Sequence, residues 1–234
     1  MIDVLGRGGR WIRDSIESAP APTLPWANPW QCTLAGILVH RPGSPLLAAG
    51  PLSMLDRFGA LHLDGGHVGF DGDRHDWSKV TAVRMRNAFE LLTTDALEQE
   101  VDRIRPLLPP VPGRKKVLTY LTQHLAIVLL AALDQGDDAI NHEIVAEIRY
   151  RGTLPAGRRV ARPSLFPAAL LSLRPDINEA LVAEALRREI PVTPADAVRR
   201  GIPDSQVERV ALLRRRTDAI IARIGVDDDG GARV

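Results

Sequence analysis

The segment GALHLDGGHVGFDG, residues 59–72, decides the fold that the sequence predicts. Apolar and polar side chains alternate on both sides of the Gly65-Gly66 pair, which is typical of two antiparallel strands joined by a two-residue turn. Successive side chains of a strand lie on opposite faces. We therefore expect a β-hairpin with one apolar face directed into the core, formed by Leu61, Leu63, Val68 and Phe70.

Further strands are expected on both sides of this hairpin. Residues 31–40, QCTLAGILVH, are mostly aliphatic and lie between two prolines, and residues 75–86, HDWSKVTAVRMR, alternate between two faces. Both segments have the composition and the bounds of strands. After about residue 89 the apolar spacing changes to three and four residues, which predicts a helix over residues 95–105. We therefore expect a β domain with a closing helix over residues 31–105.

The second half of the chain has the apolar spacing of helices. We expect helices over residues 115–134, 138–150, 164–173, 176–189 and 205–224, another starting at Thr193-Pro194, and a basic loop over residues 151–163. The prolines of residues 106–114 predict a linker between the halves. The sequence thus predicts an α+β protein in five parts: a proline-rich arm (1–30), a β domain (31–105), the linker (106–114), an α-helical domain (115–225) and a flexible tail (226–234).

The β-rich part resembles a known family of modules. A hairpin with a glycine turn is followed by a Trp-Ser-x-Val entry into the next strand and then by an amphipathic helix, an order that resembles bacterial PH-like or GRAM-like domains. The matching residues are Leu61, Leu63, Gly65, Gly66, Val68, Phe70, Trp77, Ser78, Val80, Val83 and Arg84. The resemblance implies a curved β-sandwich of seven strands closed by a C-terminal helix, and a role in interaction or membrane targeting rather than catalysis. It does not imply phosphoinositide binding, because the loops here are acidic or apolar.

Composition and charge exclude several classes of protein. The chain has 234 residues, of which 45% are hydrophobic and 25% charged. These fractions exclude disordered, collagen-like and fibrous classes. A single cysteine, Cys32, excludes an intramolecular disulfide. The net charge of +1 predicts neither a polyanionic nor a polycationic partner, but residues 56–102 are acidic and residues 149–216 are basic. We expect the two halves to dock on each other.

The densest group of metal-ligating side chains lies around the glycine turn. In a two-residue hairpin Asp64 lies opposite His67, and His62 is two residues away on the same face. Two imidazoles and a carboxylate on one face can bind zinc or iron. His62, Asp64 and His67 are therefore candidate ligands of a metal-dependent enzyme, with an ordinary cross-strand Asp–His pair as the alternative. We find no other catalytic pattern, and we predict no cofactor.

Two other groups of residues are candidates for binding a partner. Trp26 and Trp30 lie among the prolines of the arm, where aromatic side chains either pin the arm to its own domain or form a partner-binding peptide. The basic stretch holds five arginines, Arg149, Arg151, Arg158, Arg159 and Arg162. These arginines can engage another protein, hold a nucleic-acid backbone, or dock on the acidic half of the chain. Few aromatic residues accompany them, which disfavours nucleic acid.

The function that these patterns favour is that of a non-catalytic, adaptor-type binding or regulatory protein that engages another protein. A metal-dependent enzyme and a binder of nucleic acid or anionic surfaces are the alternatives. The expected helix over residues 205–224 has a seam that suits helix pairing within the chain or across a homodimer. No export signal opens the sequence, and its longest apolar run, Leu125–Leu133, is too short to cross a bilayer. We therefore expect a cytoplasmic protein that is not integral to a membrane, and the near-zero net charge disfavours peripheral binding to anionic membranes.

Overall fold

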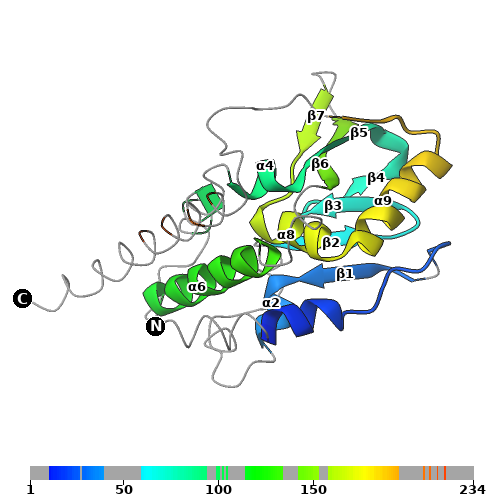
Figure 1. Ribbon diagram of the computed structural model, residues 1–234. Coiled ribbons are helices and arrows are strands. Elements are labelled where there is room, and N and C mark those ends of the chain that lie inside the picture. Colours follow the sequence, from blue (N-terminus) through cyan, green and yellow to red (C-terminus); the bar gives the residue numbers. More distant parts are fainter. Residues whose placement is uncertain are drawn as a thin grey trace, which may run out of the picture.

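The computed structural model describes residues 11–26, 28–39, 59–93, 99–100, 102, 104, 114–133, 142–152, 158–194, 208, 211, 215 and 219. These residues form two four-stranded sheets and several helices (Figure 1). The chain is therefore a mixed α and β protein, as the sequence predicts. Among the described strands neither sheet closes on itself, since each has a linear strand order.

The first sheet contains the predicted hairpin. Its strands are β1 (Trp30–Thr33), β2 (Ala60–Leu63), β3 (His67–Phe70) and β4 (His75–Asp76), antiparallel in that order. Leu61 lies opposite Phe70 and Leu63 opposite Val68, and all four side chains are buried. The predicted hairpin and its core face are thus confirmed.

The strand expected over residues 31–40 is wrong beyond Thr33. The chain turns there into helix α2 (Leu34–Val39). The Thr33 hydroxyl accepts a hydrogen bond from the Gly36 amide at 2.9 Å, which is the contact of a helix N-cap. A threonine that satisfies the first free amides of a helix ends the strand, although the residues that follow are aliphatic enough to continue it.

The expected strand over residues 75–86 is interrupted by a single turn of 3-10 helix, η2 (Trp77–Lys79). The Asp76 carboxylate accepts a hydrogen bond from the Ser78 amide at 2.8 Å and so caps this turn. The buried Trp77 indole donates to the Asp64 carbonyl at 3.1 Å. The turn transfers the chain from the first sheet to the second, where β5 (Val80–Asn87) begins.

The second sheet joins residues that lie on both sides of the expected linker. Its strands are β5, β6 (Glu143–Arg151), β7 (Arg158–Ala161) and β8 (Val192–Pro194), in the order β7-β6-β5-β8. The β5–β6 and β6–β7 pairs are antiparallel and the β5–β8 pair is parallel. Residues 106–113 of the linker lie outside the described residues, but the sheet itself connects the β-rich half to the half that we expected to be helical.

Three predictions for this half are therefore wrong. The helix expected over residues 138–150 is β6 from Glu143 onward, the basic loop over residues 151–163 is partly strand, and Thr193-Pro194 belongs to β8 instead of starting a helix. Apolar residues four apart share one face of a helix and also one face of a strand. The spacing of Ile144 and Ile148 in the sequence therefore fits either structure; in β6 an irregularity in the pairing with β5 lies between them, and both are fully buried.

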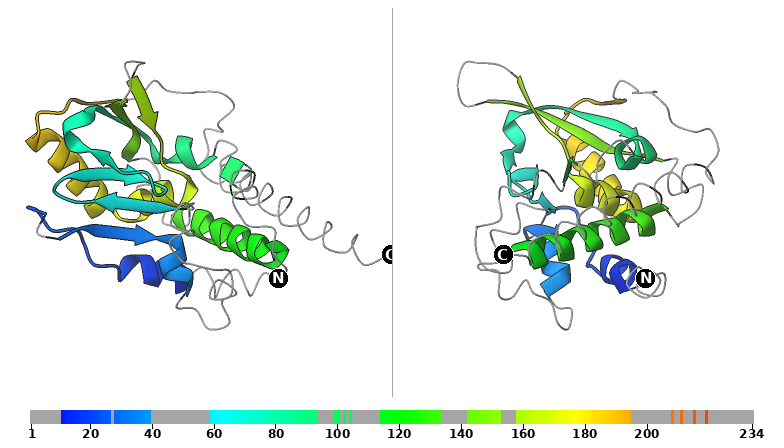
Figure 2. Two further views of the ribbon diagram at one scale, coloured as in Figure 1. Left: turned by 180° about the vertical axis from the view of Figure 1, so that it is seen from behind. Right: turned by 90° about the vertical axis from the view of Figure 1, so that its left-hand side faces the viewer.

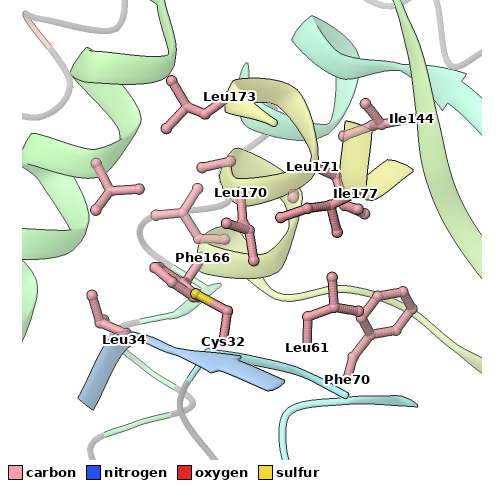
Figure 3. Close-up of a cluster of buried hydrophobic side chains, with 14 of the residues drawn as sticks. Cys32, Leu34, Leu61, Phe70, Ile144, Phe166, Leu170, Leu171, Leu173 and Ile177 are labelled. Carbon is pink, nitrogen blue, oxygen red and sulfur yellow. The ribbon is translucent and has the colours of Figure 1, made fainter. Parts of the chain in front are cut away.

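Helix α8 (Leu165–Leu173) is the centre of the fold. All nine of its residues are buried, and it contacts β2 of one sheet, β6 of the other, and helices α4 (Ala88–Thr93), α6 (Arg114–Leu133) and α9 (Pro175–Arg187). Figure 3 shows Phe166 of α8 beside Leu34 and Cys32, and Ile177 of α9 beside Ile144. A helix that is apolar on every side must be enclosed. The predicted helices α6, α8 and α9 are confirmed.

None of the described helices combines the length and apolar character that a bilayer span requires. Between residues 95 and 105 the described residues 99, 100, 102 and 104 are helical, and so are residues 208, 211, 215 and 219 of the expected last helix. The apolar seam of that last helix, with its proposed homodimer contact, and the tail 226–234 lie outside the described residues.

The arm is more ordered than the sequence predicts. Residues 11–17 are helical, and Ile12 and Ile16 are fully buried. Arg174 donates from Nη1 to the carbonyl oxygens of Ile16 and Ala19, both at 2.8 Å, and binds the Asp176 carboxylate through Nε and Nη2. The guanidinium thus satisfies carbonyl groups at the end of the first helix. Asp176 is not the cap of α9 as expected, because Arg174 holds that position.

A buried glutamate on α9 gives the protein a predictable response to acid. The Glu184 side chain is 0% exposed and accepts hydrogen bonds from Arg187 Nε at 2.8 Å and from Arg188 Nε at 2.6 Å. The Arg187 hydrogen bonds, together with those of Arg188, hold the pKa of Glu184 below its ordinary value of 4.5. Arg188 also reaches the Gly65 carbonyl and lies 5.3 Å from the centroid of the Trp77 ring, so the carboxylate supports the glycine turn.

We expect the free energy of unfolding to fall as the pH drops below about 4.5, because the depressed pKa favours the folded state only while the carboxylate is ionised. The contribution of Glu184 to stability is complete above the pKa that this group has in the unfolded chain. It is lost as the pH falls through the lower pKa that the group has in the folded protein. Urea unfolding at neutral pH and at several acidic pH values measures it. Glu184→Gln should flatten this part of the pH dependence, and an unchanged profile in the variant would contradict the assignment.

Candidate binding surface

Arginine side chains gather on the face of the second sheet that is turned away from the first. Tyr150 of β6 stacks on His75 of β4, with the ring centroids 3.8 Å apart, so Tyr150 faces the first sheet. Because side chains alternate along a strand, Arg149 and Arg151 lie on the opposite face. Arg149 and Arg151 are separated by one residue in the sequence, so in a strand their side chains lie on the same side of the sheet.

The pairing of the strands extends this arginine face. Arg84 of β5 lies opposite Glu147, and Arg158 of β7 lies opposite Arg151. Residues that are directly opposite in an antiparallel pair lie on the same side of the sheet. We define the arginine face as Arg84, Arg149, Arg151 and Arg162 together with Glu147.

Glu147 organises the middle of the arginine face. Its side chain is 9% exposed, and one carboxylate oxygen, Oε1, accepts from Arg162 Nε at 3.1 Å and from Arg162 Nη2 at 3.0 Å. Its other oxygen accepts from Arg149 Nη2 at 3.4 Å. A buried carboxylate needs such partners, and in return it orients two guanidinium groups. The Arg162 side chain is still 70% exposed and able to contact a ligand.

Positive charge is in excess on this face. Glu147 contacts two of its arginines, Arg149 and Arg162. Arg151, at the end of β6, is exposed. An anionic ligand on this face would offset the repulsion between neighbouring guanidinium groups.

The structure places the other expected arginine, Arg159, differently. It lies opposite Tyr150 and therefore on the other side of the hairpin, where it is exposed. Our sequence reasoning also missed Arg84, which lies far from the basic stretch in the chain. The sequence does place Arg84 and Arg86 on one side of the expected strand. It does not show which later strand pairs with β5.

The two tryptophans of the arm contact the body of the protein. Trp30 begins β1 opposite Leu63, and its indole donates to the Pro20 carbonyl at 2.7 Å. Trp26 lies beside the glycine turn, since a methyl group at Gly65 would be 3.9 Å from Trp26 Cβ. Both side chains are partly buried against the core. These contacts pin the arm to its own domain, and both residues lie at the first sheet rather than on the arginine face.

The expected metal site does not assemble. Asp64 and His67 do meet, with Oδ1 and Nδ1 3.3 Å apart, and Asp64 also accepts hydrogen bonds from the Gly66 and His67 amides at 2.6 Å. His62 is 4% exposed and opposite Gly69, with its Nδ1 3.4 Å from Arg74 Nη2. Every residue of β2 is buried, so His62 is enclosed instead of joining the exposed turn. In the described part of the chain no three His, Cys, Asp or Glu side chains are placed to hold a metal ion.

The single cysteine is buried and unreactive. Cys32 lies in β1 and is 7% exposed, beside Leu34 and Phe166 (Figure 3). Burial raises the pKa of its thiol to about 12. Since the thiolate is the nucleophilic form, Cys32 is not a candidate nucleophile at neutral pH.

No protein-family model, no curated protein and no solved structure matches this chain.

Proposed function

We propose that this chain is a non-catalytic binding protein that engages another protein by docking acidic groups of that partner on the arginine face. The observation that carries the proposal is the group of Arg149, Arg151 and Arg162 on one face of the second sheet, where Glu147 contacts Arg149 and Arg162 and Arg151 is exposed. Guanidinium groups bind carboxylates with two parallel hydrogen bonds, which gives such a surface direction as well as charge.

The arrangement favours carboxylates on a protein over the phosphates of nucleic acid. Glu147 lies within the face and would repel a continuous phosphate backbone, but it leaves Arg151 and Arg162 available to separate carboxylates. Proteins that bind single strands stack bases on exposed aromatic rings. The aromatic residue of β6, Tyr150, is stacked on His75 on the other side of the sheet.

The strand arrangement supports extending the resemblance to PH-like domains beyond residue 105. The described residues contain four antiparallel strands in the first sheet and three, β5 to β7, in the second, followed by α8 and α9; the second sheet also contains the short parallel strand β8, which comes after α9. Seven strands and a closing helix are what the resemblance implies. On this reading α6 is an insertion between β5 and β6, and the PH-like module is the scaffold that presents the arginine face.

Reversing the charge of Arg151 tests the proposed function. We expect a fluorescent peptide rich in glutamate to bind the full chain, and Arg151→Glu to weaken that binding by at least about tenfold, close to 1.4 kcal/mol. The stability of the variant should change by less than about 0.5 kcal/mol, because Arg151 is exposed at the end of β6. Fluorescence anisotropy measures the affinity, and urea unfolding measures the stability.

Lys79→Glu is the matched control, since it makes the same charge change at an exposed residue of η2. We expect it to bind the peptide within about twofold of the unmodified chain because surface charges outside the contact are screened by salt. Equal weakening by both variants would mean that only the net charge matters. Binding of duplex DNA in preference to the peptide would favour the nucleic-acid alternative.

A further inference from the structure

Among the described strands, β7 forms one edge of the second sheet. It pairs with β6 through residues 158–161, and the strand order places no described strand on its other side. In an antiparallel pair about half of the main-chain groups of each strand point away from the partner strand. Among the described residues, no hydrogen bond reaches the main chain of β7 from that outer side. Figure 2 shows the β6–β7 hairpin at the periphery of the fold.

The other sheet edges are less suited to accept a strand. β8 ends in Pro194, which has no amide to donate, and β4 is two residues long. β1 follows Pro29 and continues directly into α2, and the helical residues 11–17 lie beside it (Figures 1 and 2). β7 is also the edge with an exposed apolar side chain, since Val160 is 41% exposed.

The side chains of β7 indicate the chemistry of its occupant. Two consecutive arginines, Arg158 and Arg159, are followed by Val160. Charged residues on an edge strand normally prevent another strand from pairing with it. A basic strand would be repelled by the two arginines, and an uncharged strand would leave the arginines without partners. An acidic strand would instead be attracted, because neighbouring strands lie about 4.8 Å apart and directly opposite side chains interact.

We propose that β7 accepts an extended acidic segment of a partner protein as a fifth strand of the second sheet. This inference rests on the proposed function and specifies how the partner binds. The segment has a β-branched residue opposite Val160 and two consecutive acids opposite Arg159 and Arg158. Its main chain pairs with β7, and the acid opposite Arg158 is in line with Arg151 on the next strand. Main-chain pairing supplies affinity, and the alternate side chains supply specificity.

The test uses the full chain and a fluorescent peptide, acetyl-Ser-Thr-Val-Glu-Glu-Thr-Ser-amide. Two further versions carry N-methyl groups on the odd or on the even amides, with no change in charge or side chains. An added strand directs only one of these two sets of amides toward β7. We therefore expect one methylated version to lose at least about tenfold in affinity and the other to bind within about twofold of the parent peptide. Hydrogen exchange of the amides of residues 159–161 should slow when the parent peptide binds.

The outcomes separate this inference from the proposed function. If both methylated peptides bind as tightly as the parent while Arg151→Glu still weakens binding, strand addition is wrong and charge docking stands. If the parent peptide does not bind at all, both are wrong. Loss of affinity with both methylated sets, without any change in hydrogen exchange at β7, also contradicts strand addition, because the peptide then pairs with something other than this edge.

Discussion

Replacing Asp71 by alanine is expected to lower the free energy of unfolding by at least about 3 kcal/mol. Asp71 is 7% exposed, and its carboxylate accepts hydrogen bonds from the amides of Gly59 and Ser164, both at 3.0 Å, and from the Ser164 hydroxyl at 2.6 Å. Ser164 precedes α8, so this carboxylate ties the central helix to the hairpin of the first sheet. Each buried amide left without an acceptor costs about 1–3 kcal/mol.

The backbone adds to this effect. Asp71 has a φ of 56°, a left-handed conformation that aspartate and asparagine tolerate better than alanine. Asp71→Asn should therefore be milder than Asp71→Ala, since it retains one acceptor oxygen and the backbone tolerance. Asp73→Ala, at an exposed position on the same turn, is the control and should change stability by less than about 0.5 kcal/mol. Urea unfolding measures all three, and equal stability of the two alanine variants would contradict the role of Asp71.

Replacing Gly59 by alanine is expected to lower the free energy of unfolding by about 2–5 kcal/mol, the sum of two separate costs. Gly59 has a φ of 86°, which side chains other than hydrogen rarely adopt. A methyl group there would also lie 2.6 Å from Cβ of Phe166, a fully buried residue of α8. The first cost is strain in the backbone, and the second is overpacking between the hairpin and the central helix.

The position of the clash makes the prediction specific. The close atom is Cβ of residue 166, which every residue except glycine possesses, so shortening Phe166 to alanine should not rescue Gly59→Ala. Gly65→Ala is the control, since its new methyl group would be 3.9 Å from the nearest atoms of Trp26. We expect it to remain close to the unmodified chain in thermal unfolding. A rescue by Phe166→Ala would show that the side chain, and not the approach of the two backbones, sets the cost.

Local patterns account for the elements that were predicted well. The hairpin of residues 60–70 has period-two alternation and a two-glycine turn, and α6, α8 and α9 have continuous apolar faces. These signals lie within one element and need no knowledge of its neighbours. β6 was mistaken for a helix because its apolar residues, four apart, fit both structures. The end of β1 depended on one hydrogen bond, between Thr33 and Gly36, that propensity does not describe.

The candidate site could be predicted only in part. The arginines of the basic stretch stand together in the sequence, and the structure keeps Arg149, Arg151 and Arg162 on one face. The sequence did not show that Glu147 neutralises part of their charge or that Arg84 joins them. The placement of the candidate metal ligands shows the same limit: spacing put His62 near Asp64 and His67, but every residue of β2 is buried and His62 is enclosed with them.

The sequence by itself determined the class of the protein, the hairpin, the buried helices and the excess of arginine in residues 149–162. Only the tertiary structure decided that β6 is a strand and that its arginines form a surface. The physical reason is that a strand is stabilised by hydrogen bonds to another strand, and here β5 supplies them from a distant part of the chain. A helix satisfies its own backbone and can be recognised locally, whereas the arginine face exists only once β5, β6 and β7 have paired.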